Sequence, residues 1–159
     1  MKKYAFGVDI GGTTCKIGFF ETTGKMLDKW EIRTNTENNG ESILSDVAKA
    51  VDNKLAQEAI SKDEVQGIGI GVPGPVDSQG IVHRCVNLGW GVVNVAEELE
   101  SLTGLKVKVG NDANVAALGE MWQGGAKGSK DVIMVTLGTG VGGGIIVDGK
   151  IVAGFNGAG

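Results

Sequence analysis

The chain has 159 residues, a formal net charge of −4 at pH 7 and only two prolines, while 42% of its residues are hydrophobic. Glycine accounts for 28 residues, about 18% of the chain against roughly 7% in an average protein. These numbers exclude a collagen-like or disordered chain, and the lack of a basic cluster argues against a nucleic acid or an anionic membrane as partner.

The uncharged runs are too short for a targeting or membrane-spanning segment. Only the uncharged residues 4–8 separate Lys3 from Asp9, whereas the apolar region of a signal peptide needs roughly 7–15 residues. The run 132–147 is rich in glycine and falls short of the ~18 apolar residues of a membrane span. Cys15 and Cys85 form no metal-binding spacing and suit a reducing compartment as small buried residues. We expect a soluble, cytoplasmic protein.

Alternating apolar residues and turn signals predict an antiparallel meander at the start of the chain, followed by a helix. The predicted strands are 4–10, 16–21 and 26–33, and a polar loop at 35–40 leads to a helix at 43–59. A buried strand at 65–72 ends at Pro73-Gly74-Pro75, and a short strand is predicted at 81–86.

The next elements alternate between helix and strand and end in a second meander. Asn94 and Glu97 resemble a capping box at the start of a helix at 95–103, and Gly104 suits the position after its end. Asp148-Gly149 is a strong hairpin signal. The other predicted elements are a strand at 105–109, a helix at 113–123, a linker at 124–130 and strands at 131–137, 144–147 and 150–153.

An internal repeat relates the two ends of the chain. Residues 6–27 and 134–152 both contain a strand, a Gly/Thr turn, a strand, a Gly-Lys turn and a strand. Such a repeat predicts two related α/β subdomains, at 1–124 and 131–159, of which the second has only begun at Gly159.

The Gly/Thr turns have the chemistry of phosphate-binding hairpin tips. Their small residues let backbone N–H groups approach an anion, and the threonine hydroxyls add donors. Lys16 supplies a positive charge beside the first tip, and Asp9 can hold a hydrated metal ion. Two facing tips would clasp a phosphate chain from both sides, while an ordinary tight turn is the alternative. The tip residues are Gly11, Gly12, Thr13 and Thr14, and Gly138, Thr139 and Gly140.

Two nucleotide motifs at the second tip are false matches. Gly138, Gly140 and Gly143 have the spacing of the dinucleotide fingerprint, but a strand rather than a helix is predicted to follow them. The run 144–150 resembles a P-loop, but Ile151 replaces the Ser or Thr that would bind Mg²⁺.

Three further positions carry polar or aromatic side chains that are weighed as functional residues against a structural role. Asn111-Asp112 lies between a strand end and a helix start, where Asp112 is either a helix cap or a base that accepts a hydroxyl proton. His83, the only histidine, has no neighbours for a metal site and no nucleophile-elbow motif for a hydrolase. Trp90 is either a core residue or a sugar-stacking face.

Four segments together resemble the ROK family of repressors, open reading frames and sugar kinases. The resemblance runs in order along nearly the whole chain, and among ROK proteins the bacterial ATP-dependent glucokinases are the most similar. It implies an actin/hexokinase-like, ribonuclease H-like ATPase subdomain with the start of a second, duplicated subdomain. The segments are Asp9-Ile-Gly-Gly-Thr-Thr-x-Lys16, Gly71-Val-Pro-Gly-Pro75, Asn111-Asp-Ala-Asn-Val-Ala-Ala-x-Gly-Glu120 and Leu137-Gly-Thr-Gly-Val-Gly-Gly-Gly144.

The resemblance also implies roles for particular residues. Asp112 matches the general base for the sugar 6-hydroxyl, and Asn111 matches a ligand of neighbouring hydroxyls. Pro73, Gly74 and Asn87 would line the sugar side of the cleft. The two tips would hold the ATP phosphates, with Asp9 near Mg²⁺. The implied partners are ATP and glucose or a similar hexose, and the full-length protein is expected to be a homo-oligomer.

The family pattern continues beyond this sequence into a Glu-x-Gly-His segment and a cysteine-rich structural zinc site. The chain therefore resembles the first half of such a kinase, and we expect it to be inactive alone. The alternatives are a kinase for another hexose or an N-acetylated hexosamine, and a non-catalytic sugar-binding or regulatory ROK protein. ROK repressors carry a helix-turn-helix before the first tip, for which the predicted strand at Tyr4 leaves no room.

Overall fold

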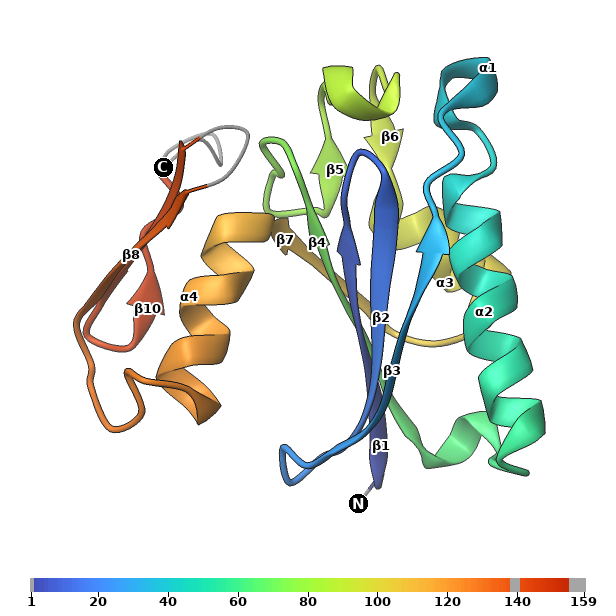
Figure 1. The fold of residues 1–159 in the computed structure, drawn as a ribbon, viewed down its shortest axis with the longest axis horizontal. Coiled ribbons are helices and arrows are strands. Elements are labelled where there is room, and N and C mark those ends of the chain that lie inside the picture. The colour runs from blue at the N-terminus through green and yellow to red at the C-terminus, as the bar shows by residue number, and fades with distance from the viewer. Residues whose placement is uncertain (1, 138–140, 155–159) are drawn as a thin grey trace.

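The computed structural model describes residues 2–137 and 141–154, which form two main β-sheets with helix α4 (Asp112–Gln123) between them (Figure 1). No helix in these two ranges is long and apolar enough to cross a membrane.

The larger sheet has five strands in the order β3-β2-β1-β4-β7. The first three strands of the chain form the predicted antiparallel meander, and β4 and β7 are added parallel to β1 on its other side. The parallel strands therefore end at the same edge of the sheet. The strands are β1 (Tyr4–Ile10), β2 (Thr14–Glu21), β3 (Met26–Arg33), β4 (Val65–Val72) and β7 (Val107–Asn111).

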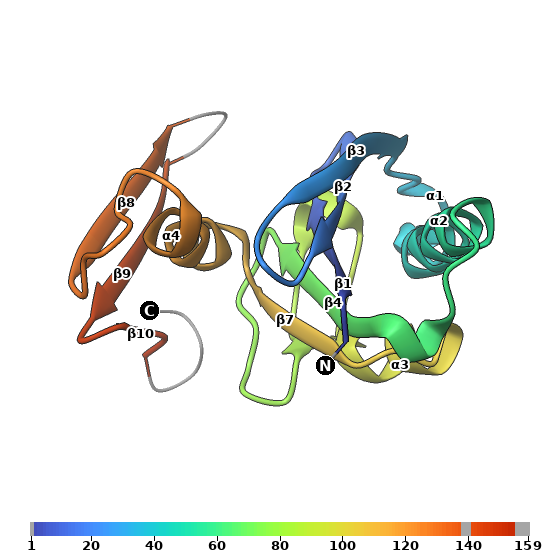
Figure 2. The same cartoon turned by 90° about the horizontal axis from the view of Figure 1, so that it is seen from below.

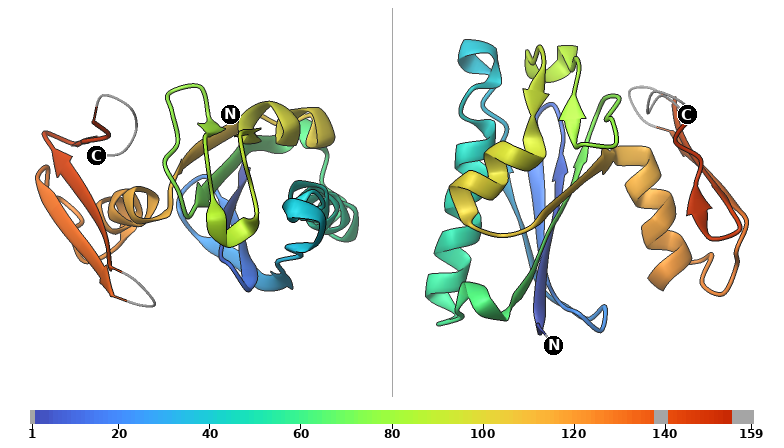
Figure 3. Two further views of the ribbon diagram at one scale, coloured as in Figure 1. Left: turned by 90° about the horizontal axis from the view of Figure 1, so that it is seen from above. Right: turned by 180° about the vertical axis from the view of Figure 1, so that it is seen from behind.

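Helices α2 (Ile43–Gln57) and α3 (Val95–Thr103) cover one face of this sheet, whereas α4 lies on the opposite side (Figures 2 and 3). The alternation of strand side chains explains the covered face, because every second residue of each strand enters one continuous apolar core with the two helices. Its members include Phe6, Val8 and Ile10 of β1, Cys15, Ile17 and Phe19 of β2, Ile68, Ile70 and Val72 of β4, Val47, Val51 and Leu55 of α2, and Val95 and Leu99 of α3.

The short helices and strands lie in segments where hydrophobic periodicity predicted a loop or a longer strand. The polar loop predicted at 35–40 contains α1 (Glu37–Gly40), interrupted by Asn38 and Asn39 at positive φ, which asparagine tolerates better than most residues. The strand predicted at 81–86 stops at Val82, because the chain turns into the 3₁₀ helix η2 (Val86–Leu88). The remaining short elements are η1 (Lys62–Glu64), β5 (Ile81–Val82) and β6 (Val93–Asn94), the last two forming a separate two-stranded sheet.

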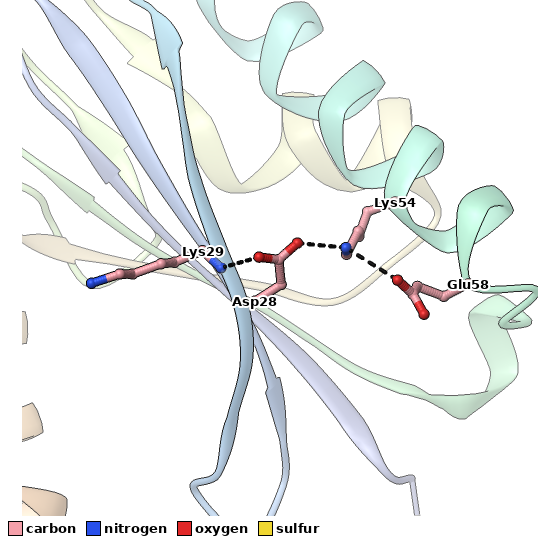
Figure 4. A network of polar contacts seen from close by, with 4 residues as sticks. All are labelled: Asp28, Lys29, Lys54 and Glu58. Atoms are coloured by element: carbon pink, nitrogen blue, oxygen red, sulfur yellow. Dashed lines mark hydrogen bonds and ion pairs between the residues drawn. The ribbon is translucent and has the colours of Figure 1, made fainter.

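A network of charges ties the edge strand β3 to α2 (Figure 4). The ammonium of Lys54, buried beside the Trp30 ring, lies 2.6 Å from a carboxylate oxygen of Asp28 and 3.2 Å from one of Glu58. The hydrogen bond from Lys54 and a second from the Lys29 backbone N–H lower the pKa of Asp28, and Asp28 raises the pKa of Lys54. The lysine therefore stays charged although its stem is buried.

The smaller meander repeats the geometry of β1–β3. Strands β8 (Val132–Leu137), β9 (Val141–Val147) and β10 (Lys150–Ile151) pair antiparallel in the order β10-β9-β8, with the predicted turn at Asp148-Gly149 in positive φ. Helix α4 covers one face of this sheet. The other face is exposed and presents Ile133, Val135, Leu137, Val141, Ile145 and Val147.

Equivalent positions in the two meanders allow a test of which sheet face is covered by helices and which is exposed. Val8 and Val135 occupy equivalent strand positions but are 4% and 59% exposed. Val8→Ala should lower the free energy of unfolding by about 2 kcal/mol, since two methyl groups leave the core and a cavity remains. Val135→Ala should change it by less than about 0.5 kcal/mol. Urea denaturation measures both, and equal effects would contradict the assignment of the two faces.

Candidate functional site

The ends of the parallel strands bring together residues that are far apart in the sequence. In the sheet register Asp9 of β1 pairs with Gly71 of β4, and Gly71 pairs with Gly110 of β7. Asn111 ends β7, and Asp112 begins α4 directly after it. The site therefore forms at the edge of the sheet where parallel strands leave it, as in other open α/β sheets.

Gly71 is the close-packed centre of this edge. A Cβ atom at Gly71 would lie 3.4 Å from the Cα atom of Asp112 and 3.9 Å from Oδ1 of Asp9, so both acids lie beside this glycine. Removal of water, and after it the negative charge of Asp112, raise the pKa of Asp9, while Lys16 acts in the opposite direction. The negative charge of Asp112 therefore acts on the Asp9 carboxyl, and a cation bound nearby would offset it.

Asp112 is the first residue of α4, and Asn111 is its N-cap. The Ala113 N–H donates to Oδ1 of Asn111 at 3.1 Å and to Oδ1 of Asp112 at 2.8 Å. Oδ2 of Asp112 accepts no hydrogen bond from any residue in the described ranges. Asn111 at the N-cap and Asp112 thus share this N–H of the first turn, and the second oxygen of the half-buried Asp112 is available to a ligand.

Asn111 also holds the turn after β4. Its Nδ2 donates to the carbonyl oxygen of Gly74 at 3.2 Å, and the Cys85 thiol donates to the carbonyl oxygen of Pro73 at 3.4 Å. Burial raises the pKa of this thiol, which keeps it protonated as a donor. The predicted sugar-side residues Pro73, Gly74 and Asn111 therefore lie together.

The first glycine tip joins β1 to β2. The Gly11 N–H donates to the carbonyl oxygen of Thr14 at 3.0 Å, and a Cβ on Gly11 would approach that oxygen to 2.7 Å, so the turn requires glycine. Across the described ranges, the N–H groups of Gly12 and Thr13 donate to no protein acceptor. Gly12 faces Asn87, whose Cβ lies 4.0 Å from the position of an added Cβ. The tip thus offers free donors beside the sugar-side residues.

Thr34, which belongs to none of the sequence motifs, holds this tip in place. Its buried hydroxyl donates to the Gly11 carbonyl oxygen at 2.7 Å and lies 3.4 Å from the Cys15 sulfur. Its backbone N–H donates to the Thr13 carbonyl oxygen at 2.9 Å. The contact links residues 23 positions apart, so no local sequence signal identifies it.

The second tip is described only at its ends. Gly138, Thr139 and Gly140 lie outside the described residues, so their predicted role in phosphate binding stays a prediction. Leu137 and Val141, on either side, form the last described pair between β8 and β9.

Asp9 is the acid of the first hairpin that could contribute to a Mg²⁺ site. Within 2–137 and 141–154, no group of three or more His, Cys, Asp and Glu side chains has the geometry of a metal site. Mg²⁺ is commonly bound by one or two carboxylates, substrate phosphates and several waters. Asp9, exposed beside the first tip, can supply such a carboxylate.

His83 and Trp90, the other two positions considered in the sequence, both form hydrogen bonds with other residues of the protein. Nε2 of His83 lies 2.8 Å from Oδ2 of Asp77 on the surface. Trp90 is a core residue, 5% exposed, whose indole N–H donates to the Gly40 carbonyl oxygen at 3.0 Å. Trp90 therefore presents no face for sugar stacking.

Comparison with known proteins identifies relatives along almost the whole chain. The model of the ROK family matches residues 5–159. A glucokinase of Halalkalibacterium halodurans is 46% identical over 156 residues, which are 98% of this chain and 47% of that protein. An N-acetylgalactosamine kinase, AgaK, of Shewanella sp. is 33% identical over 95% of this chain and 47% of its own length. The chain thus spans about half the length of these relatives.

A solved structure has the same fold. The ROK glucokinase from Streptomyces griseus, in complex with glucose and AMPPNP, superposes with a TM-score of 0.84 at 37% identity, over 97% of this chain and 47% of that one. The fold class expected from the sequence is therefore confirmed: a hexokinase-like α/β subdomain followed by the first strands of a second one.

The contact between Thr34 and the first tip predicts a measurable contribution to stability. Thr34→Val keeps the shape of the side chain but leaves the Gly11 carbonyl without its donor, which should cost about 1–3 kcal/mol of unfolding free energy. Thr34→Ser keeps the hydroxyl and is the matched control. If denaturant midpoints show Thr34→Val to be as stable as Thr34→Ser, the hydroxyl does not hold the tip.

Proposed function

The chain belongs to the ROK family, and we propose that it forms the first half of an ATP-dependent kinase that phosphorylates the 6-hydroxyl of glucose. The observation that carries this proposal is the position of Asp112. It begins α4 beside Gly71 and Asp9, and one of its carboxylate oxygens is without a partner among the described residues. The likeness to glucokinases from two bacteria supports glucose as the substrate.

In this proposal Asp112 acts as the general base. Its free Oδ2 accepts the proton of the glucose 6-hydroxyl while the hydroxyl oxygen forms a bond to the γ-phosphorus of ATP. The bond from this phosphorus to the oxygen bridging it to the β-phosphate breaks, and ADP leaves. Positioning and charge stabilisation account for most of the catalysis of phosphoryl transfer. A carboxylate held at a helix start by the packing around Gly71 provides that positioning.

The other site residues divide between sugar and nucleotide. Asn111 fixes the Pro73-Gly74 turn, and this turn and Asn87 would line the sugar side. On the nucleotide side, the free N–H groups of the first tip would donate to phosphate oxygens. Lys16 would add positive charge from the same hairpin. Gly138, Thr139 and Gly140 would approach the phosphates from the other subdomain.

Asp9 would hold Mg²⁺ through its exposed carboxylate and bridging waters. The ion would neutralise negative charge on the phosphates and offset the repulsion between Asp9 and Asp112. The second half found in the relatives would supply the adenine pocket, the remaining sugar ligands and the structural zinc site.

An N-acetylated hexosamine is the second candidate substrate, favoured by the 33% identity to an N-acetylgalactosamine kinase. In this proposal the sugar-side residues named above would lie near the 6-hydroxyl end of the hexose, which glucose and N-acetylated hexosamines share. They do not distinguish a hydroxyl from an acetamido group at the far side of the ring. Rates with glucose, N-acetylglucosamine and N-acetylgalactosamine would separate the two proposals.

The proposal predicts activity only when both halves are present. Residues 1–159 joined to the unmatched second half of the Halalkalibacterium halodurans glucokinase should release ADP in the presence of glucose and ATP. The 159-residue chain alone should not. Asp112→Ala in the joined chain should lower kcat roughly 10²–10⁴-fold, the usual contribution of a general base.

Asp63→Ala is the matched control for this variant, because Asp63 is an exposed acid in η1, outside the proposed site. A coupled assay of ADP release compares the variants. An Asp112→Ala enzyme that keeps the rate of the Asp63→Ala control would leave Asp112 as a structural residue of α4. Glucose-dependent ADP release by the 159-residue chain would contradict the need for a second half.

A further inference from the structure

A strained backbone turn lies a few residues before α2. Asn38, Asn39 and Gly40 have φ values of 50°, 60° and 67°, so three successive residues are in the left-handed region. Asparagine and glycine tolerate this region best, but they normally enter it as single residues. Strained segments persist where the surrounding structure holds them, and they gather at functional sites. The contacts of this turn therefore indicate its role.

The turn holds the loop 85–90, which carries Asn87 and is called the Asn87 loop below. The carbonyl oxygen of Gly40 accepts a hydrogen bond from the indole N–H of the buried Trp90 at 3.0 Å. A Cβ added to Gly40 would lie 2.8 Å from that indole nitrogen, and a Cβ added to Gly89 would lie 3.1 Å from the Cα atom of Asn39. The two segments therefore pack closely, and a glycine on each side permits this approach.

The Asn87 loop is closed at its base and anchored on both sides. The backbone N–H groups of Cys85 and Trp90 each donate to the carbonyl oxygen of the other residue, at 3.1 and 3.0 Å. The Cys85 thiol ties this base to the Pro73 carbonyl oxygen. Leu88 is fully buried in the core, whereas Asn87 is exposed next to it. The position of Asn87 therefore depends on where the base of the loop is held.

The segment that ends in the strained turn also holds the first glycine tip. Thr34, at its start, donates to two carbonyl oxygens of the tip from its hydroxyl and its backbone N–H. Gly12 of the tip faces Asn87, whose Cβ lies 4.0 Å from an added Cβ. The strained turn and the Asn87 loop lie at the end of the molecule where β1 turns into β2 (Figure 1). Residues 34–40 thus connect the tip at one end with the Asn87 loop at the other.

We propose that residues 34–40 align the sugar side of the site with the phosphate side, and that Trp90 is a positioning residue that acts through Asn87. This inference rests on the proposed function, in which Asn87 lines the sugar side and the first tip holds phosphates. Trp90 is buried and touches no substrate in that arrangement. Its indole N–H fixes the Asn87 loop relative to the tip, which keeps the bound sugar and the phosphates at a set separation. Phosphoryl transfer depends on such positioning.

A double-mutant cycle in the chain joined to the Halalkalibacterium halodurans second half tests the inference. Trp90→Phe removes the indole N–H but keeps an aromatic ring in the core, and Asn87→Ala removes the amide. Each substitution should raise the KM for glucose roughly 3–10-fold, the contribution of one hydrogen bond between uncharged groups, with little change in the KM for ATP. In the Asn87→Ala background, Trp90→Phe should raise the KM for glucose no further, because Trp90 acts through Asn87.

Trp30→Phe is the matched control for Trp90→Phe. Trp30 also packs against the core, but its indole N–H donates to no residue in the described ranges. Its substitution should leave the KM for glucose unchanged. Gly40→Ala breaks the same contact from the other side, since alanine is strained at a φ of 67° and crowds the indole nitrogen. Gly40→Ala should therefore reproduce the effect of Trp90→Phe, and only when Asn87 is present.

An amide NMR spectrum of the 159-residue chain gives a readout that needs no kinase activity. Trp90→Phe should shift the backbone amide resonance of Gly12, which faces Asn87, while Trp30→Phe should not. The inference is overturned if this resonance does not respond to Trp90→Phe, if Asn87→Ala leaves the KM for glucose unchanged, or if the two effects multiply in the double variant. Loss of the base in Asp112→Ala appears in kcat instead, so this inference and the proposed reaction fail separately.

Discussion

The parallel register of β1, β4 and β7 is the constraint on which the site depends. It sets Asp9, Gly71 and Gly110 level across three strands, and α4 begins two residues after Gly110. A Cβ added at Gly71 would lie in van der Waals contact with Asp112 and with Asp9, so both acids lie close to this point of the backbone. A slip of one residue would turn Asp9 into the core and Ile10 toward the candidate site, since side chains alternate across a strand. The same register presents the first tip and the Pro73-Gly74 turn at one edge.

The glycine excess of the chain has a common physical basis in close backbone approach. At the first tip Gly11 permits a turn in which the N–H groups of Gly12 and Thr13 remain free, and Gly71 lies beside two carboxylates. Gly142 and Gly144 let α4 lie directly on β9. Glycine in a strand interior costs roughly 0.5–1 kcal/mol relative to alanine. Positions of this kind are therefore expected where function or the packing of a second element compensates for the cost.

Local patterns in the sequence predicted much of the fold. Alternation predicted the bounds of β1, β3 and β4, and the Asn94 cap and Gly104 predicted α3, because these signals lie within the elements themselves. The two-residue strand β6 and the hydroxyl of Thr34 act through partners more than ten positions away, which no local pattern shows. For the site, spacing left open whether Asp112 caps a helix or accepts a proton. In the structure Asn111 is the N-cap and Asp112 accepts the same N–H with one oxygen, while the catalytic role of Asp112 remains a prediction.

The site requires that the charge of Asp112 acts on Asp9 beside Gly71, and a carboxyl ¹³C NMR titration of Asp9 tests this most directly. The pKa of Asp9 should lie above the ordinary aspartate value of 3.8, and neutralising its neighbour in Asp112→Asn should lower it. A raised pKa means that the charged Asp9 opposes folding above that pKa, and protonation relieves this as the pH falls through it. A pKa of Asp9 at or below its ordinary value that does not respond to Asp112→Asn would contradict the account.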